Sequence, residues 1–569
     1  MNIKNKVSKI KFQSWGELGL LFVLLIILNI MAQFWYERID LTQDQRYSLG
    51  QETRELLSEL DDVVYFRIYL EGDLPSDFRR LNGSIRDILQ EFQSYAGDNI
   101  QFRFIDPNDY DREQRRDVQN QLRDLGLDPI NLQVERDGGR SEQMVFPGAI
   151  VSYKGRERSA QLLQSQMGRP PEQVIHGSII SLEYQLANAM RQLKKPDRER
   201  IAFIEGHGQL PEIYTSSIQD ELEKYYEVER VNIREYMVGK LEEFDLAIMA
   251  RPTRPIPEVD KYKIDQFIMN GGRMLWLVDK LGMSMDSLDQ SGIGYTSDLD
   301  LNLEDQLFRY GARINFNLIQ DLNSHQIPLV SRGAGGRPMQ NLRQWPYFPL
   351  VMPNNNHPVV NNLNAILFRF PSTIDTVGDE SIHKEILLQT SQFSRVQPHP
   401  VRISIQEGAG RQRQELFGHG SQNVAVLLEG EFTSLFRGRL TEDTRQDIRY
   451  GDFKEQSPEN RMIVVSDGKV IKNAVRDRGT QPLPLGFDQF TYQTFGNQDF
   501  ILNCVDYLLD DSGLIELRGK DYQLRMLNPS RAENEKTFWQ VLNMIIPVLI
   551  VILFGLIYNY VRKRKFALK

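Results

Sequence analysis

The chain has 569 residues, of which 41% are hydrophobic, 10% aromatic and 25% charged, and its formal net charge is −9. This composition is typical of globular protein and excludes extended disorder, and the acidic balance argues against a nucleic-acid-binding surface, which would be basic. The single cysteine, Cys504, excludes an internal disulfide framework. The length allows roughly two to four domains.

Two apolar segments, residues 18–36 and 541–560, each have about the 20 residues that a helix needs to cross a bilayer core. Basic residues flank both segments on their terminal sides, and such flanks stay in the cytoplasm: Lys4, Lys6, Lys9, Lys11, Arg562, Lys563, Arg564 and Lys565. We therefore expect two transmembrane anchors in the inner membrane, short cytoplasmic tails at 1–17 and 561–569, and a large body facing the periplasm.

The first apolar segment has an alternative interpretation as a cleaved signal peptide, because it has a basic start and an apolar middle. A signal peptidase requires small residues before its cut, whereas this segment ends in the bulky run Phe34, Trp35 and Tyr36. Aromatic residues at that position are typical of the interface belt of an anchor, which favours a membrane helix.

The region from 37 to 195 predicts an α/β domain. Strands are expected at 63–70, 100–105, 131–135 and 144–153, and helices at 78–96, 111–125 and 174–193, from apolar residues spaced with the periods of strand and helix. This order fits a thioredoxin-like domain. It has no Cys-x-x-Cys, which excludes thiol redox chemistry.

The region from 196 to 535 begins with a second α/β pattern. Strands at 201–204, 227–231, 245–250 and 274–278 alternate with helices at 213–225 and 258–269, which predicts a parallel, doubly wound sheet of flavodoxin-like type. A mixed α/β extension follows, with strands expected at 314–319, 365–370, 386–390, 423–428 and 462–466, an irregular loop at 341–358, and helices at 303–310 and 498–509.

Ligands of doubly wound sheets bind beyond the carboxyl ends of the strands. Two of the predicted strands are followed by candidate residues at that end. Glu205, Gly206, His207 and Gly208 follow the strand at 201–204, and Arg251 follows the strand at 245–250. The glycines permit a close backbone approach and His207 offers a hydrogen-bonding or proton-transferring group. These five residues form the candidate ligand site, and the alternative is a tight structural turn whose histidine only caps the helix or faces water.

Several motifs together resemble the GldG family of gliding-motility ABC-transporter components. They are Arg38-Ile39-Asp40-Leu41-Thr42 after the first anchor, the Glu205-Gly206-His207-Gly208 turn, Arg251-Pro252-Thr253-Arg254-Pro255, and the segment from Asn503 to Asp511. The resemblance covers nearly the whole chain. It implies an auxiliary or substrate-binding subunit that works with a separate permease and a cytoplasmic ATPase, and a flavodoxin-like domain shared with an intraflagellar-transport protein and associated with sugar binding. It assigns no catalytic residue.

Catalytic motifs are missing from the sequence. There is no phosphate-binding loop of the Gly-x-x-x-x-Gly-Lys-Ser/Thr type, no Gly-x-Ser-x-Gly nucleophile turn and no His-Glu-x-x-His zinc motif. We expect a non-enzymatic chain without cofactor or metal. Cys504 is predicted to be a core thiol, and Trp345, Tyr347 and Phe348 either pin a loop to the core or stack on a ligand such as a sugar.

The prediction is therefore a membrane-anchored auxiliary subunit of an ABC transporter linked to gliding, which binds a permease, an ATPase and, in one reading, a carbohydrate. Two alternatives stay open. One is a tethered carbohydrate-binding protein or hydrolase in the periplasm, and the other is a structural scaffold that couples a transporter to surface machinery.

Overall fold

The computed structural model describes residues 49–567, apart from 137–138, 164–170, 196–197, 236–238, 333–337, 354, 356, 362, 406–411, 441–451, 477–478 and 520–528, together with some residues between 19 and 27. The chain divides into two compact units, Met1–Lys520 and Asp521–Lys569. The predicted first anchor falls mostly outside the described residues, and those described between 19 and 27 are helical and exposed.

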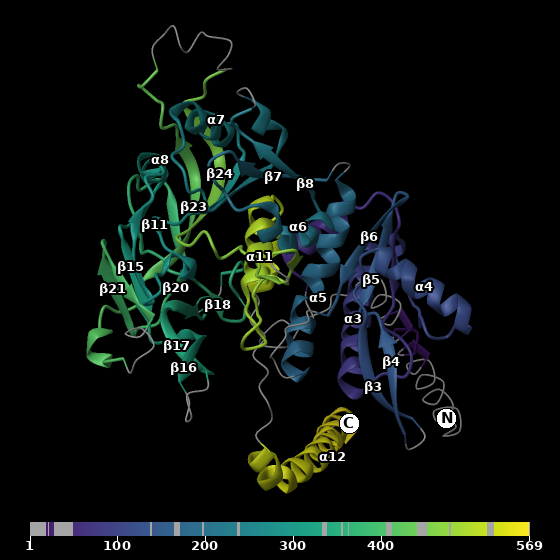
Figure 1. Ribbon diagram of the computed structural model, residues 1–569. Coiled ribbons are helices and arrows are strands. Elements are labelled where there is room, and N and C mark those ends of the chain that lie inside the picture. The colour runs from purple at the N-terminus through teal and green to yellow at the C-terminus, as the bar shows by residue number, and fades with distance from the viewer. Residues whose placement is uncertain are drawn as a thin grey trace, which may run out of the picture. The chain divides into compact units, whose positions relative to one another are not determined.

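The first part of the larger unit is an α/β layer built on a four-stranded sheet with the order β2-β1-β5-β6 (Figure 1). Strands β1 and β2 are parallel, and β5 and β6 are antiparallel to their neighbours. The elements are α2 (Gln51–Ser58), β1 (Val64–Ile68), α3 (Ser76–Ala96), β2 (Ile100–Phe104), α4 (Arg112–Asp124), the hairpin β3 (Ile130–Arg136) and β4 (Gly139–Val145), β5 (Gly148–Tyr153), β6 (Arg156–Gln161) and α5 (Pro171–Lys194).

Helix α3 packs its apolar stripe against this sheet. Val64, Phe66 and Ile68 alternate along one face of β1, and Leu81 and Ile85 on α3 are buried in the same cluster. The expected single strand at 144–153 is wrong, because β4 ends at Val145 and β5 begins at Gly148 after Pro147. Proline lacks the N–H that a continuous strand would donate.

The second part is a seven-stranded sheet with the order β20-β23-β24-β10-β9-β7-β8. Strands β8, β7, β9 and β10 are parallel, as predicted. Strand β24, which was expected in the extension, joins them as a fifth parallel strand, and the edge is completed by β23 and β20, each paired antiparallel with its neighbour. The bounds are β7 (Arg200–Glu205), β8 (Glu227–Asn232), β9 (Leu246–Ala250), β10 (Arg273–Leu277), β20 (His383–Gln389), β23 (Asn423–Thr433) and β24 (Gln456–Val465).

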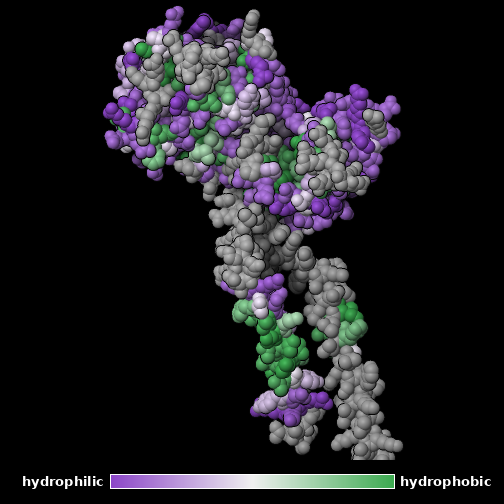
Figure 2. Space-filling view, turned by 60° about the horizontal axis from the view of Figure 1, so that its bottom comes forward, coloured by the Kyte–Doolittle hydropathy of each residue, from purple (hydrophilic) through white to green (hydrophobic). Residues whose placement is uncertain are grey.

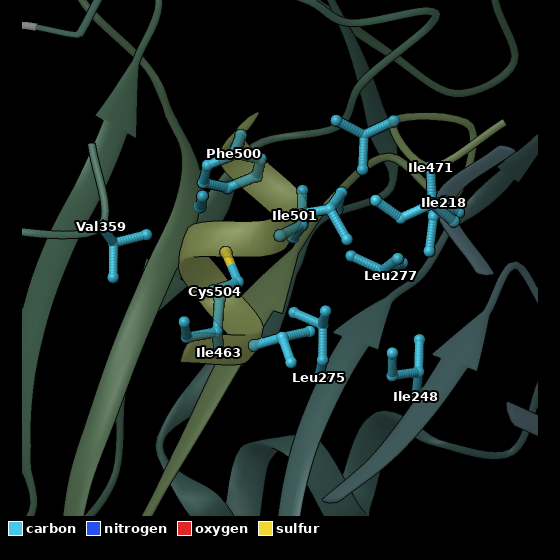
Figure 3. Close-up of a cluster of buried hydrophobic side chains, with 14 of the residues drawn as sticks. Ile218, Ile248, Leu275, Leu277, Val359, Ile463, Ile471, Phe500, Ile501 and Cys504 are labelled. Carbon is cyan, nitrogen blue, oxygen red and sulfur yellow. The ribbon is translucent and has the colours of Figure 1, made fainter. Parts of the chain in front are cut away.

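Helices cover both faces of this sheet. On one face α6 (Ser216–Glu223) and α11 (Asn497–Leu509) share a buried cluster with the strands, and on the other α7 (Glu258–Met269) and α8 (Glu304–Tyr310) do so. Figure 3 shows Phe500, Ile501 and Cys504 of α11 facing the strands that carry Leu275 and Ile463. Cys504 is fully buried, which confirms the predicted core thiol.

The extension contributes mainly short paired strands. They are β11 (Leu281–Gly282), β12 (Ile293–Tyr295), β13 (Ser297–Asp298), β14 (Ala312–Ile314), β15 (Asn317–Asp321), β16 (Ser324–Arg332), β17 (Pro338–Val351), β18 (Ile366–Leu367), β19 (Ile374–Thr376), β21 (Ser394–Pro398), β22 (Arg402–Ser404), β25 (Val475–Arg476), β26 (Gln481–Pro482), β27 (Phe487–Asp488) and β28 (Gln493–Thr494). The expected strand at 314–319 is in fact two strands, because β14 and β15 pair with different partners, β19 and β21.

The irregular loop expected at 341–358 is also wrong, because β17 is a 14-residue strand that pairs with β16. Its aromatic residues Trp345, Tyr347 and Phe348 are buried in a local core with Phe370. Long-range pairing satisfies a backbone whose prolines and asparagines locally resemble a loop. These rings therefore pin the segment to the core and offer no exposed stacking surface.

The described part of the smaller unit is one long helix, α12 (Pro529–Ala567). Within its stretch Glu535–Arg564, an 18-residue window has a mean hydropathy of 2.7 and is unburied, and this stretch is the one candidate membrane span among the described residues. Figure 2 shows a hydrophobic column with hydrophilic residues at both ends.

Candidate functional site

The predicted site residues lie at the carboxyl ends of the parallel strands of the seven-stranded sheet. Glu205 ends β7, Gly206 to Gly208 follow it, and Arg251 follows the neighbouring strand β9. Backbone hydrogen bonds join the two loops, since the amides of Thr253 and Arg254 each donate to the His207 carbonyl at 3.0 Å. The structure therefore brings the predicted residues together.

Both glycines are required by the geometry of the turn. Gly206 has φ +114° and Gly208 φ +71°, in the region that side chains rarely adopt. A Cβ on Gly206 would lie 2.7 Å from Asn232 Oδ1, and one on Gly208 would overlap Thr253 Oγ1. The close approach that these glycines permit is to the protein's own loops.

Glu205 and His207 each have an internal partner. Arg230 Nε donates to Glu205 Oε1 at 2.6 Å. His207 Nε2 lies 3.0 Å from Asp260 Oδ2 on α7, and only 2% of His207 is exposed. Burial lowers the pKa of His207, against the opposing influence of Asp260, so the imidazole is a buried neutral group rather than one aimed at solvent.

Arg251 belongs to a buried charge cluster that the sequence did not reveal. Its Nε donates to Asp279 Oδ2 at 2.8 Å, and Lys469 Nζ donates to the same oxygen. The backbone amide of Gly468 donates to the other oxygen of the same carboxylate, Asp279 Oδ1, at 2.7 Å. Asp279 follows β10 and Lys469 follows β24, so three neighbouring strands supply the cluster.

The two carboxyl groups of the cluster, Asp279 and Asp467, differ in electrostatic environment. Burial alone would raise the pKa of Asp279, but Lys469 and Arg251 hold it below its usual value. Burial raises the pKa of Asp467 to about 6, even though Lys469 acts in the opposite direction. Asp467 accepts the amides of Arg369 at 2.6 Å and Lys469 at 2.8 Å, so it also fixes the loop after β24.

The cluster had only a partial signal in the sequence. Asp279 was not among the five candidates, although it stands after a predicted strand as Arg251 does, and this position was a signal for it. Asp467 and Lys469 also follow a predicted strand, at 462–466, but β24 is separated from β10 by about 180 residues and only the sheet order makes the two strands neighbours.

The charged side chains of this site are paired with one another. Among the described residues, no group of three or more His, Cys, Asp or Glu is placed to hold a metal ion. The site carboxylates face Arg230, Arg251 and Lys469 of the same chain. The contacts at these strand ends hold the loops that follow the strands against one another.

Comparisons with known proteins add a family and a full-length relative. A family described as "ABC-type uncharacterized transport system" matches residues 198–504, which is more than half of the chain, and a domain of unknown function matches residues 43–152. An uncharacterized protein of Borreliella burgdorferi (strain B31) is 19% identical over 562 residues, covering 96% of this chain and 97% of that protein.

A solved structure described as "mmIFT52 N-terminal domain" also matches. It is 13% identical and covers 55% of this chain and 99% of its own, with a TM-score of 0.32.

Proposed function

Because this chain belongs to the family of uncharacterized ABC-type transport systems, we propose that it is a membrane-anchored, non-catalytic auxiliary subunit of an ABC transporter linked to gliding motility. It works with a separate permease and a separate cytoplasmic ATPase. The observation that carries the proposal is the family match together with the apolar span of α12.

The charge around α12 supports an orientation. Arg562, Lys563, Arg564 and Lys565 follow the span directly, and positively charged flanks stay on the cytoplasmic side. In the proposed topology the larger unit faces the periplasm of an inner membrane, and residues 18–36 form a second anchor, as the lysines before them favour.

Sheet topology supports the two finer domain assignments. The order β2-β1-β5-β6, with one parallel pair and two antiparallel additions, supports a thioredoxin-like domain. The parallel strands β8-β7-β9-β10-β24 run in the order 2-1-3-4-5 when numbered along the chain, which is the flavodoxin-like order.

The contacts of the candidate site support a non-catalytic role. A general base needs a side chain within reach of a substrate, whereas His207 is buried against Asp260 and Glu205 is paired with Arg230. Binding by Glu205 to Gly208 and Arg251 stays a prediction, and a structural role for the turn is favoured by these contacts.

Co-purification of the full chain in mild detergent tests the proposal. The native protein should retain a permease and an ATPase, and replacing residues 541–560 by an unrelated leucine-rich helix, with Arg562 to Lys565 kept, should release both while the larger unit stays folded. A matched control exchanges three exposed residues of α4, Glu113, Arg116 and Asp117, for serine and should keep both partners.

Other outcomes separate the alternatives. Retention of both partners by the helix-swapped protein would place the contact in the larger unit. A native protein that retains neither partner and hydrolyses a glycan unaided would replace the auxiliary role with the hydrolase, and one that instead retains only surface machinery would support the scaffold.

A further inference from the structure

A cleft of about 400 Å³ lies between α5 of the first α/β layer and α11 of the second. The two helices lie side by side in Figure 1, and Tyr184 Oη on α5 donates to Asp506 Oδ2 on α11 at 3.1 Å. The volume falls within the range of about 300–1,000 Å³ that is usual for ligand pockets, which often occur at such junctions.

Polar side chains line the cleft from both helices at helical spacing. Helix α5 contributes Ser181, Gln185, Asn188 and Gln192, and α11 contributes Asp499, Asn503 and Asp506. Residues three and four positions apart share one face of a helix, so each helix presents a polar stripe to the cleft. Each buries apolar residues elsewhere, such as Leu182 and Leu186 on α5 and Phe500 and Cys504 on α11.

The charge of the lining excludes an anionic ligand. Neither lysine nor arginine occurs among the described lining residues, whereas Asp128, Asp499 and Asp506 do. Asp506 already accepts the hydroxyls of Tyr184 and Tyr226, and Asp128 lies 3.6 Å from Lys224 Nζ. Because these carboxylates already have partners within the chain, the chemistry of the cleft is set mainly by its amides.

Two of the amides have hydrogen-bonding capacity to spare. The side chains of Gln185 and Gln192 are half-buried and have no hydrogen-bond partner among the described residues. An amide both donates and accepts, and a hydroxyl does the same, so neighbouring hydroxyl groups satisfy such a stripe. Tyr225 and Leu502 add apolar lining against which C–H groups of a ring pack.

We propose that the α5–α11 cleft is a binding site for a neutral polyhydroxylated ligand of the sugar type, with Gln185 and Gln192 as hydrogen-bonding residues. The site is distinct from the turn after β7. It goes beyond the transporter role, because binding in the cleft does not depend on a permease or an ATPase.

Ligand-observed NMR on the purified full chain in detergent tests the site. The probes are cello-, malto-, chito- and laminari-oligosaccharides, with spermidine as a cationic probe and inorganic phosphate as an anionic one. At least one oligosaccharide should bind. The double variant Gln185→Leu/Gln192→Leu should weaken that binding about tenfold or more, since each lost hydrogen bond costs about 1 kcal/mol.

Gln121→Leu, on the exposed part of α4, is the matched control and should bind as the native protein does. A second variant, Gly177→Phe, acts without removing a polar group: a Cβ at Gly177 meets no atom within 4 Å, so the ring fills the cleft and should also weaken binding. It serves as well if the double variant fails to fold.

Three outcomes would overturn the inference. No binding by any oligosaccharide removes the sugar-type ligand. Undiminished binding by folded Gln185→Leu/Gln192→Leu and Gly177→Phe proteins moves the site elsewhere. Binding of spermidine alone, lost in the same variants, assigns the cleft to an organic cation.

Discussion

Removing the carboxylate of Asp279 should destabilise the larger unit more than any change at a surface ion pair. In Asp279→Ala, Arg251 and Lys469 lose their shared partner at Oδ2, and the Gly468 amide loses its acceptor. The side chain of Asp279 is 1% exposed and that of Lys469 is 7% exposed, so water does not replace the lost contacts.

The expected loss follows from this burial. Removing one partner of a buried ion pair leaves an uncompensated buried charge and costs roughly 3–5 kcal/mol. Asp375→Ala is the matched control, because Asp375 pairs with Arg313 where both side chains are about half exposed. Exposed pairs contribute about 0–1 kcal/mol.

Urea unfolding of the full chain in detergent, followed by tryptophan fluorescence, measures both free energies. Trp276 on β10 is fully buried and lies close to the cluster in sequence. Adding Lys469→Met to Asp279→Ala should recover at least about 1 kcal/mol, because the more deeply buried of the two cations that lose Asp279 is then gone. A loss below about 1 kcal/mol, equal to that of the control, would refute the account of the cluster.

Three further predictions concern single residues. Gly208→Ala should lower the free energy of unfolding by more than about 1 kcal/mol, because φ at Gly208 is +71° and the added Cβ overlaps Thr253. The control Gly418→Ala should be nearly neutral, because its Cβ meets no atom within 4 Å. Equal urea midpoints for the two variants would contradict this prediction. Burial lowers the pKa of His357 to about 4, so below the unfolded value near 6.5 the unfolded chain binds the extra proton and native stability should fall from pH 6.5 towards 4. Urea midpoints between pH 6.5 and 4 should fall less steeply for His357→Gln than for the native protein. Parallel slopes for the two proteins would refute the role of His357. Burial raises the pKa of the Cys504 thiol well above its usual value, so maleimide should label it only as urea unfolds the chain, and rapid labelling of the native protein would show an open core.

Local sequence patterns were sufficient for many single elements. Helix α7 spans Glu258–Met269, the bounds predicted from the spacing of its apolar residues. The buried strands β7, β9 and β10 were recognisable in the sequence as short apolar runs. The apolar stretch within α12 was equally plain, because span length and charge are properties of contiguous residues. Cys504 could be assigned to the core because its helix carries apolar neighbours on the same face.

Local sequence patterns did not predict the contacts between segments that are far apart in the chain. The irregular loop expected at 341–358 is largely the strand β17, and its pairing with β16 together with the buried ring of Trp345 overrode a loop-like composition. Likewise β23 and β20 extend a sheet that had been expected to be parallel. Strand pairing of this kind depends on partners that no local window contains.

The candidate site divides along the same line. The sequence by itself determined that Glu205, the two glycines and Arg251 stand at strand ends, because strand ends are local features. Only the tertiary structure decided that His207 turns to Asp260 and that Arg251 shares Asp279 with Lys469. Direction and partnership of a side chain depend on which elements pack around it, and burial then makes those partnerships obligatory, since an unpaired buried charge is costly.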